Sequence, residues 1–499
     1  MDPTHLTAGR VPGARWSRRR ALRGLLLGTA GVAVLAACGG TTPSVTTSAS
    51  ATESRAASAT TSSAAAPAAS GAAVSTQSAG TSSSGSVSAA ASAARAGASL
   101  RFSFFGDNAE AAIWTKIAQD FGAGAGVQVT PEHIPSDYFT KVQAEVAAGD
   151  AADVILMEDK PTAGYAQKGV FHALDPYIGT DSTFKLDDYY PVLFDGLRYQ
   201  GKLYGLPQHW LVHMLLYNKA HFQQAGLPLP AADWKDASWN WDAFLGAAKK
   251  LTVSENGKIT RYGFALSGYA WTYWRMWVWQ NGGDVVSPDL KHSVLDQTPA
   301  IDGIQFYADL ANVQHVAPTA AELKALNNPG FTDLFAQGKA AMTSSAPYLF
   351  DLRTQLKDID WDVAPEPMKV KRAAPLWPDS ISMNAATKAP ELSWQLLRYV
   401  LGPQGQTTIT TLGRGVPVLK SIANSPAFLQ TGKAPQNIKI YLDAPDYGVV
   451  TQYTTVWTKM EQANTEELTP ALQGQRSAKE AVSRLVPRIN ALLQSAEMG

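Results

Sequence analysis

Strand-like and helix-like segments alternate along the chain from about residue 100. Residues 101–105 form a short apolar run that predicts a buried strand, and apolar side chains recur at four-residue spacing over 113–121, as on one face of a helix. Further strands are expected at 127–129 and 153–157. This alternation is typical of βαβ units, so we expect an α/β fold with mostly parallel sheets and flanking helices.

Glycine and serine residues indicate where the helices begin and end. Glycines within 122–126 are expected to end the first helix, and a phosphate loop is disfavoured there because the Lys-Ser/Thr pair is missing. Ser136 is the expected cap of a second helix that Gly149 ends. The end of the chain predicts a helix over 482–492, which Pro487 could kink.

Length and charge exclude several classes of protein. With 499 residues, the chain is long enough for two or three domains. Its 42 basic and 42 acidic side chains balance, which argues against a nucleic-acid partner, since such proteins carry a basic surplus. Cys38 is the only cysteine, so an intramolecular disulfide and a Cys-rich metal site are both excluded.

The first 37 residues are typical of a bacterial export signal. A basic stretch at 17–23 precedes an apolar run at 25–37, which is too short to span a bilayer. The arginines after Ser17 resemble a twin-arginine signal, although Ala21 replaces the usual phenylalanine and the general secretory route stays open. Cys38 ends a lipoprotein-like box, Leu35-Ala-Ala-Cys38, so we expect a lipidated cysteine rather than a stray buried thiol.

Residues 39–99 consist almost entirely of Ala, Ser, Thr and Gly. Such a composition buries too little apolar surface to offset the entropy of ordering, so we expect a disordered tether. With the lipidated Cys38, residues 38–99 would hold a folded body near the outer face of the cell membrane.

Polar residues follow two of the predicted strands. Asp107 and Asn108 come after the first strand, and Glu158 and Asp159 come after the third. Ligands of open parallel sheets bind beyond the carboxyl ends of the strands, so these four residues are candidate ligand contacts. Solvated loops and helix caps are the alternative reading of each.

Several segments, in this order, resemble the sugar-binding family of extracellular solute-binding proteins of ABC importers, of which the maltose-binding protein is a member. The longest segment covers residues 153–169. The shorter ones are Gly201-Lys-Leu-Tyr-Gly-Leu-Pro207, Leu216-Tyr-Asn-Lys219, Phe335-Ala-Gln-Gly-Lys-Ala-Ala-Met342, Leu397-Arg-Tyr-Val400, Gln404-Gly405-Gln406 and Gly413-Arg-Gly-Val-Pro417.

This resemblance implies a two-lobed periplasmic-binding-protein fold with a hinge. The first lobe would comprise 100–208 and 378–413, and the second 212–373 and 416–499. A monomeric, non-catalytic receptor is implied, which closes around a carbohydrate and delivers it to a membrane permease. No cofactor is implied.

Aromatic side chains suited to stacking on a sugar gather in one segment. Trp271, Tyr273 and Trp274 belong to a run of six aromatic residues between 269 and 279. We expect one or two of the six to reach the ligand and the others to be core, because a packed helix would show the same spacing.

The resemblance places further ligand contacts elsewhere in the chain. Tyr348 and Trp457 match positions where relatives carry stacking rings, and Trp377 and Asp379 would face the hinge. Maltose itself is disfavoured, because Lys160 begins the Lys-Pro pair that replaces the maltose-type Asp-Arg pair.

His209 and His213 are four residues apart, as two zinc ligands on a helix would be. The segment predicts a strand and no glutamate follows His209, so we expect no metal site. His209 and Trp210 are instead expected to be cleft residues near the hinge.

Two other functions stay open. A secreted carbohydrate-active enzyme would need two carboxyl groups across the scissile bond, for which Asp107, Glu158, Asp159 and Asp379 are available. Alternatively, a receptor of this kind could bind glycerol phosphate, with Arg414 as the candidate for the phosphate, or a polyamine.

Overall fold

The computed structural model describes residues 98–265, 271–327, 329–346 and 349–497. The predicted export signal, Cys38, almost all of the predicted tether, and Tyr348 lie outside these residues. None of the helices in the described ranges is both long and apolar enough to cross a bilayer.

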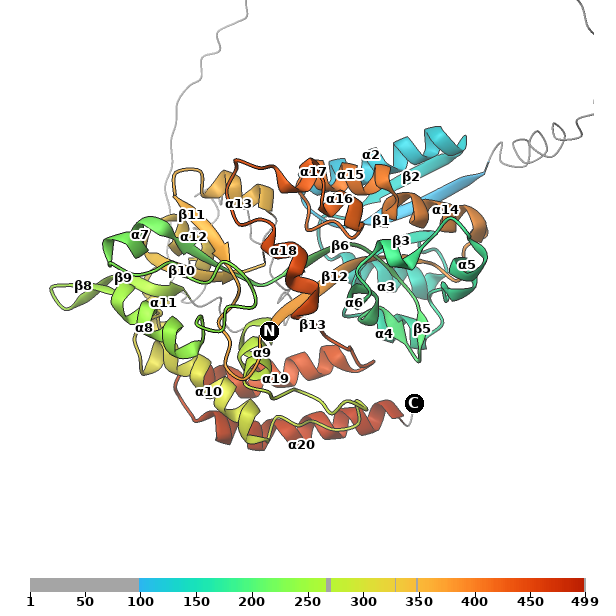
Figure 1. Cartoon of the computed structure of the whole chain (residues 1–499). Coiled ribbons are helices and arrows are strands. Elements are labelled where there is room, and N and C mark those ends of the chain that lie inside the picture. The colour runs from blue at the N-terminus through green and yellow to red at the C-terminus, as the bar shows by residue number, and fades with distance from the viewer. Residues whose placement is uncertain (1–97, 266–270, 328, 347–348, 498–499) are drawn as a thin grey trace, which may run out of the picture. The chain divides into compact units, whose positions relative to one another are not determined.

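The first sheet is mixed, with a parallel part built from the predicted strands (Figure 1). β1 pairs in parallel with β2 and β3, whereas β12 runs antiparallel to both β3 and β6. We call this sheet and its helices the first lobe. Its strands are β1 (Ser99–Phe104), β2 (Gln128–His133), β3 (Val154–Glu158), β6 (Leu206–Val212), β12 (Ala374–Met383) and β13 (Gly448–Val450).

Two helices connect the first three strands, and their ends confirm one prediction and correct another. α2 (Asn108–Ala125) begins after Asp107 and ends at Gly126, which takes the left-handed conformation with φ 69°. α3 (Tyr138–Ala148) also ends at the predicted glycine, Gly149. Its cap is Asp137 rather than Ser136, because the chain turns at Asp137 with φ 53° and leaves the serine outside the first turn.

The second sheet is buried on both faces at β7, β10 and β11, whereas β8 and the first half of β9 are more exposed. Its strand order is β11-β7-β10-β9-β8, and alternate residues of β7 enter two different hydrophobic clusters. Leu216 packs into the cluster that continues from the first sheet, whereas Leu215 packs into the second cluster. The strands of this second lobe are β7 (Met214–Asn218), β8 (Val253–Glu255), β9 (Lys258–Ala265), β10 (Ala340–Ser345) and β11 (Trp361–Ala364).

Helices cover the second cluster, and they include the helix of the aromatic segment and the two C-terminal helices. α19 and α20 lie side by side, and α10 packs against both (Figure 1). Pro487 lies inside α20, which continues past it. These helices are α8 (Trp241–Leu251), α9 (Trp271–Gln280), α10 (Thr298–Asn312), α19 (Trp457–Leu472) and α20 (Ala478–Glu497).

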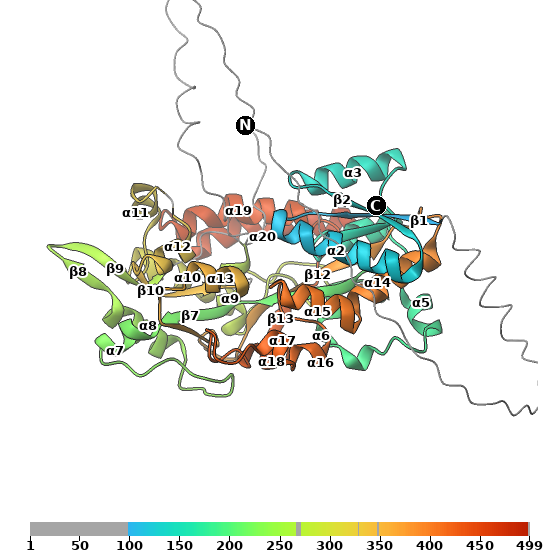
Figure 2. The ribbon, with the colours of Figure 1, turned by 90° about the horizontal axis from the view of Figure 1, so that it is seen from above.

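The chain passes between the two sheets at several points. His213 alone separates β6 from β7, and its backbone N–H donates to Pro375 O at 3.0 Å, at the start of β12. Nearby, the Trp210 N–H donates to Val416 O at 3.1 Å, so residues 413–418 run alongside β6. Figure 2 shows β12 and the neighbouring strands from above.

Residues 448–450 lie in the first sheet, although the sequence assigned 416–499 to the second lobe. Val418 and Phe428 belong to the cluster that extends over both sheets, which also includes Trp361 of β11. β13 also pairs with β12. The reason is physical: β13 pairs with Ala374–Leu376, the part of β12 that β3 leaves unpaired on that side.

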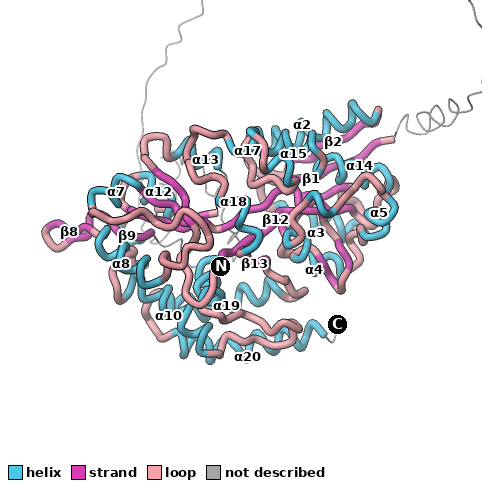
Figure 3. The backbone as a smooth tube through the Cα atoms, in the orientation of Figure 1, coloured by secondary structure: helices cyan, strands magenta, loops and turns pink. Residues whose placement is uncertain are grey.

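The remaining elements are mostly short helices that connect the strands (Figure 3). On the first sheet's side they are α4 (Thr162–Gln167), α5 (Asp175–Thr180), η1 (Leu186–Asp188), α6 (Val192–Asp195), β4 (Arg198–Tyr199), β5 (Lys202–Leu203), α14 (Pro390–Leu401), α15 (Pro403–Thr411), α16 (Lys420–Ala423), α17 (Pro426–Leu429), α18 (Ile440–Asp443) and η2 (Ala444–Asp446). The second lobe adds α7 (Lys219–Gln224), α11 (Ala320–Ala325), α12 (Phe331–Ala336) and α13 (Leu349–Gln355).

Candidate functional site

One guanidinium group joins the two lobes. Arg414 is only 5% exposed, and its Nη2 lies 2.6 Å from Asp107 Oδ1 at the start of α2. Its Nη1 lies 3.7 Å from Asp351 Oδ2 on α13 of the second lobe. Because α2 and α13 belong to different lobes, Arg414 connects them through one pair of carboxylates.

The two carboxylates around Arg414 differ in their acidity. Burial works to raise the pKa of Asp107, but the Glu110 N–H and Arg414 outweigh it, so the pKa lies below its usual value. Burial raises the pKa of Asp351, and Arg414 offsets only part of that effect. Asn108, the first residue of α2, is exposed beside this arrangement.

A second connection forms where β3 ends. Lys160 Nζ of the first lobe lies 3.5 Å from Glu461 Oε1 on α19, and both side chains are mostly buried. The neighbouring Asp159 is 1% exposed, and burial raises its pKa well above the usual value despite the nearby Lys160 ammonium. Tyr453 precedes α19, and hydrogen bonding from its hydroxyl lowers the pKa of Asp159, which favours the ionised carboxylate.

Arg275 supports the second-lobe side of this connection. Its guanidinium carbon lies 4.5 Å from the Trp279 ring centroid and 5.0 Å from that of Trp457, and its Nη2 donates to Thr451 Oγ1. Burial lowers the pKa of Arg275 to about 10, so the side chain stays charged at neutral pH. A flat cation between two indole rings fixes the position of Trp457.

His209 of the first lobe lies beside residues 413–418, where the chain passes between the lobes. His209 Nε2 lies 3.3 Å from Asp379 Oδ2, and its Nδ1 lies 2.7 Å from Gln208 Oε1. Gly415 packs directly on this imidazole, because a Cβ at that position would lie 2.4 Å from the ring, and its φ of +57° also favours glycine. The backbone path of residues 413–418 between the lobes is therefore set in part by the position of the His209 ring.

A chain of buried polar groups runs through the hinge at His213. Its Nδ1 lies 3.0 Å from Ser344 Oγ, and Ser344 donates to Glu366 Oε1 at 2.5 Å. Burial raises the pKa of Glu366 to about 8, and burial lowers that of His213 to about 3. The His213 ring also lies 5.6 Å from the Trp377 ring and 4.7 Å from that of Tyr273.

A hollow of about 1100 Å³ opens between the lobes next to Tyr453. Tyr199 and Tyr204 line it from the first lobe, and Lys291 and Tyr453 line it from the second. Tyr453 therefore contributes both to this hollow and to the buried cluster around Asp159.

The two histidines considered as zinc ligands serve different neighbours. His209 contacts Asp379 and Gln208, whereas His213 contacts Ser344. In the parts of the chain that the structure describes, no three His, Cys, Asp or Glu side chains gather as they would around a metal ion.

The comparison with known families decides the identity of this chain. A family model described as bacterial extracellular solute-binding protein matches residues 106–407, which is more than half of the chain. The chain belongs to the bacterial extracellular solute-binding protein family. A binding protein from Brucella abortus strain 2308 is 25% identical over 319 residues, which cover 60% of this chain and 70% of that protein.

Solved structures share the two-lobed fold of this solute-binding protein. An ABC substrate-binding protein from Listeria monocytogenes, in complex with cycloalternan, has a TM-score of 0.70 and 23% identity over 79% of this chain and 99% of that one. The GacH receptor of Streptomyces glaucescens, solved without ligand and with acarbose, has a TM-score of 0.67 and 22% identity over 80% of this chain and 99% of that one. The expected fold and family are thus confirmed.

The predicted aromatic contacts of this solute-binding protein differ in how deeply they are buried. Trp210 and Trp274 are fully buried core residues, and Trp210 Nε1 donates to Pro417 O at 3.0 Å. Tyr273 and Trp457 are buried too, whereas Trp377 is half-buried. The side chain of Trp271 lies outside the described part of the chain, as does Tyr348.

Sequence reasoning missed several residues at the junction of the lobes. They are Arg275, Tyr453, Asp351, Glu461 and, as a contact between the lobes, Lys160. Arg275 stands out in the sequence as the only charged residue of the aromatic run, and Tyr453 precedes Trp457 by one helical turn. The two carboxylates carry no local signal, because only the fold brings them to a cation.

Proposed function

We propose that this chain is the lipid-anchored substrate-binding component of an ABC importer, which captures a carbohydrate between its lobes. The observation that carries the proposal is the placing of Arg414 between Asp107 of one lobe and Asp351 of the other. A ligand that orders these groups stabilises the arrangement in which the lobes meet. Family membership supports the assignment to an importer.

The ligand proposed is neutral because both cations at the junction already lie against carboxylates, and only one carboxylate is left over. Arg414 lies against two carboxylates, and Lys160 lies against Glu461. A glycerol phosphate would require a cation in surplus, and a polyamine would require several carboxylates in surplus. Half-buried Trp377 and the rings near Tyr453 provide the apolar faces that lie against pyranose C–H groups. The Listeria and Streptomyces proteins, which share this fold, were solved with cycloalternan and acarbose.

The residues proposed for the site come from both lobes. The accessible ones among the residues of the sequence prediction are Asp107, Asn108, Glu158 and Trp377. The buried Asp159, His209, Asp379, Arg414 and Trp457 lie beside the junction and would support them. Tyr273 would support these contacts indirectly, because its ring packs against that of His213. Trp271 and Tyr348 stay predictions.

Closure of the hinge supplies the mechanism. A ligand that contacts both lobes binds the closed form more tightly than the open form, so it shifts the population toward closure. The short connection at His213 lets the lobes rotate without unfolding either sheet. A permease that recognises the closed form then receives only loaded protein.

Catalysis is not part of the proposal. A glycosidase needs a carboxylic acid and a second carboxylate on opposite sides of a scissile bond. Asp159 has a raised pKa, but it is fully buried beside Lys160 and Tyr453. Asp379 is held by His209. We therefore propose that a bound sugar leaves unchanged.

One experiment tests capture and catalysis together. The full chain is first screened by thermal shift against neutral mono- and oligosaccharides, glycerol phosphate and spermidine, since a ligand raises the unfolding midpoint by mass action. Calorimetry then measures affinity for the best ligand, and an assay for reducing ends measures turnover. Binding of a neutral sugar without new reducing ends supports the proposal. Preference for the phosphate or the polyamine, or release of reducing ends, contradicts it.

The anchor and the route to the membrane are proposed from the sequence. Residues 1–37 would be the export signal, Cys38 the lipidated residue, and residues 39–99 the tether to the outer face of the cell membrane. Cys38→Ser should move the exported protein from the membrane fraction to the medium. A variant that stays in the membrane fraction contradicts a lipid anchor.

A further inference from the structure

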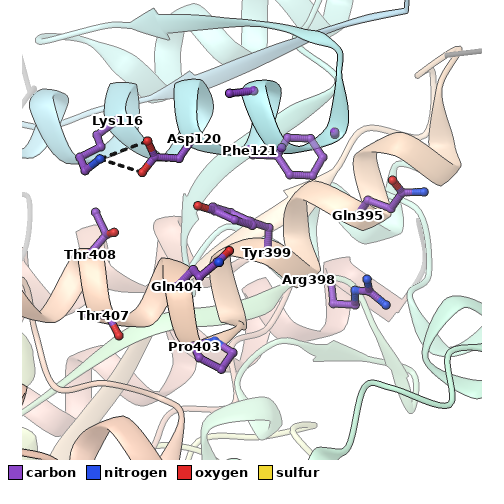
Figure 4. A pocket seen from close by; sticks show the side chains of 13 residues that line it. Lys116, Asp120, Phe121, Gln395, Arg398, Tyr399, Pro403, Gln404, Thr407 and Thr408 are labelled. Atoms are coloured by element: carbon purple, nitrogen blue, oxygen red, sulfur yellow. Dashed lines mark hydrogen bonds and ion pairs between the residues drawn. The ribbon is translucent and has the colours of Figure 1, made fainter. Parts of the chain in front are cut away.

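The first lobe carries a second hollow, formed by three helices at a different place from the junction. It measures about 940 Å³ and lies between the end of α2 and the helices α14 and α15 (Figure 4). Its size is within the range of small-molecule sites. None of the residues predicted to contact the cleft ligand lines it.

The charged groups on its rim are already paired. Lys116 Nζ lies 2.8 Å from Asp120 Oδ2, one turn along α2. Arg398 Nη1 lies 2.9 Å from Asp181 Oδ2 and donates to Thr183 Oγ1 at 2.6 Å. A charged ligand would have to break one of these pairs, so the hollow favours a neutral ligand.

Neutral polar side chains face the same space. The amides of Gln395 and Gln404 and the hydroxyls of Thr407 and Thr408 line the hollow, and none of the four makes a side-chain hydrogen bond to another described residue. An amide offers both donors and acceptors, and a hydroxyl offers one donor and two acceptor positions. These are the groups that pair with the hydroxyls of a sugar.

An aromatic ring provides the apolar surface between them. Figure 4 shows Tyr399 reaching from α14 into the space between α2 and α15. The ring is half-buried and lies 5.6 Å from that of Phe121, which limits its rotation. Burial raises the pKa of Tyr399, so its phenol stays protonated and able to donate a hydrogen bond.

The last turn of α2 forms an open wall. Residues 123–125 line the hollow, and a Cβ on Gly124 would meet nothing within 4 Å. Carbonyl oxygens at the end of a helix have no partner within the helix, so they are available as acceptors. Small residues keep this wall accessible to a ligand.

We propose that this hollow binds a neutral saccharide unit at a second site, separate from the cleft between the lobes. A peptide fits it less well, because three helices offer no sheet edge for an added strand and the rim offers no spare charge. Since α2, α14 and α15 all belong to the first lobe, this site does not depend on closure of the hinge. It can hold one part of a longer chain while the cleft is open.

An array of immobilised neutral oligosaccharides tests the second site separately from the cleft. We would compare the wild-type full chain with Tyr399→Ala, which removes the ring from the hollow, and with Trp377→Ala at the junction of the lobes. At least one glycan should bind Trp377→Ala as well as it binds the wild type, and bind Tyr399→Ala at least tenfold more weakly. A glycan that binds Tyr399→Ala normally but binds Trp377→Ala weakly is bound in the cleft. The proposals for the two sites can therefore be contradicted independently.

Matched variants keep the test valid if Tyr399→Ala folds poorly. Gln404→Ala alters an exposed side chain of the hollow, and Gln223→Ala removes another exposed amide, from α7 of the second lobe. The first should weaken the same glycans severalfold and the second should leave them unchanged. The proposal is overturned if every glycan that binds the wild type binds Tyr399→Ala and Gln404→Ala equally, or if no glycan binds the wild type.

Discussion

Arg414 Nη2 lies 2.6 Å from Asp107 Oδ1, although 307 positions separate the two residues in the chain. Asp107 also caps α2 by accepting from the Glu110 N–H at 2.9 Å. The same carboxylate thus fixes the start of a first-lobe helix and holds the arginine that contacts Asp351 in the second lobe. A change at Arg414 should therefore affect the relation between lobes more than the fold of either lobe.

Arg414→Lys should weaken binding of the cleft sugar about tenfold, or about 1.4 kcal/mol. A lysine keeps the charge but has no fork to contact Asp107 and Asp351 together. Calorimetry measures the affinity. As a control, Arg101→Lys alters the 2.6 Å contact with Glu132 within the first sheet and should leave the affinity unchanged. Equal affinities for Arg414→Lys and the wild type would contradict the linking role.

The pair of Lys160 and Glu461 should be coupled in ligand binding. If this 3.5 Å contact helps to hold the lobes together, Lys160→Met and Glu461→Gln should each weaken binding severalfold, and the double variant should be no weaker than either one. The coupling free energy should be about 1 kcal/mol. Lys219→Met, which breaks the 2.6 Å contact with Asp360 within the second lobe, is the control. Additive losses would argue that the two residues act independently.

Two tryptophans should separate stability from binding. Trp274 is 1% exposed in the second-lobe core, so Trp274→Ala should lower the free energy of unfolding by about 3–5 kcal/mol. Trp377 is half-buried at the hinge, so Trp377→Ala should cost less stability and weaken the cleft sugar at least tenfold. Urea unfolding and calorimetry measure the two effects. A Trp377→Ala protein with wild-type affinity would remove this ring from the site.

The buried Glu366 should make stability depend on pH. Its pKa is about 8 in the folded protein, against about 4.3 in an unfolded chain. Between these values the folded state keeps a proton that the unfolded state has released, so stability falls as pH rises, by up to about 1.4 kcal/mol per pH unit. Above about pH 8 the decrease should level off.

Glu366→Gln removes the titrating group, so the variant should lose much of this dependence. Unfolding midpoints of the wild type and the variant are compared at pH 5, 7 and 9, with the exposed Glu391→Gln as the control. The control should follow the wild type. A Glu366→Gln protein whose midpoint changes with pH as much as that of the wild type would show that another group titrates.

Local patterns were sufficient for the first three strands and the two helices that connect them. The apolar run near Phe102 became β1, and the four-residue spacing from Ile113 to Phe121 became α2, which ended at the glycines. Such features depend on neighbours within a few positions, so the sequence carries them directly. The parallel pairing of β1, β2 and β3 follows from their helical connections.

Partners distant in the sequence could not be predicted in the same way. Trp210 and Trp274 look as suitable for stacking as Trp377 does, but the fold buries the first two and leaves the third accessible. Nothing near Asp351 or Glu461 in the sequence identifies their cations. Residues 448–450 also joined the first sheet, because an open strand edge beside β12 was available only after folding.

The sequence by itself determined the first three strands, the two helices between them, the family and the two-lobed fold, because hydrophobic periodicity and short motifs act over local distances. The tertiary structure alone decided which charges meet at the junction, which rings remain accessible and where the second hollow lies. Those features depend on side chains that are brought together from positions hundreds of residues apart, and their energies exist only after both sheets have packed.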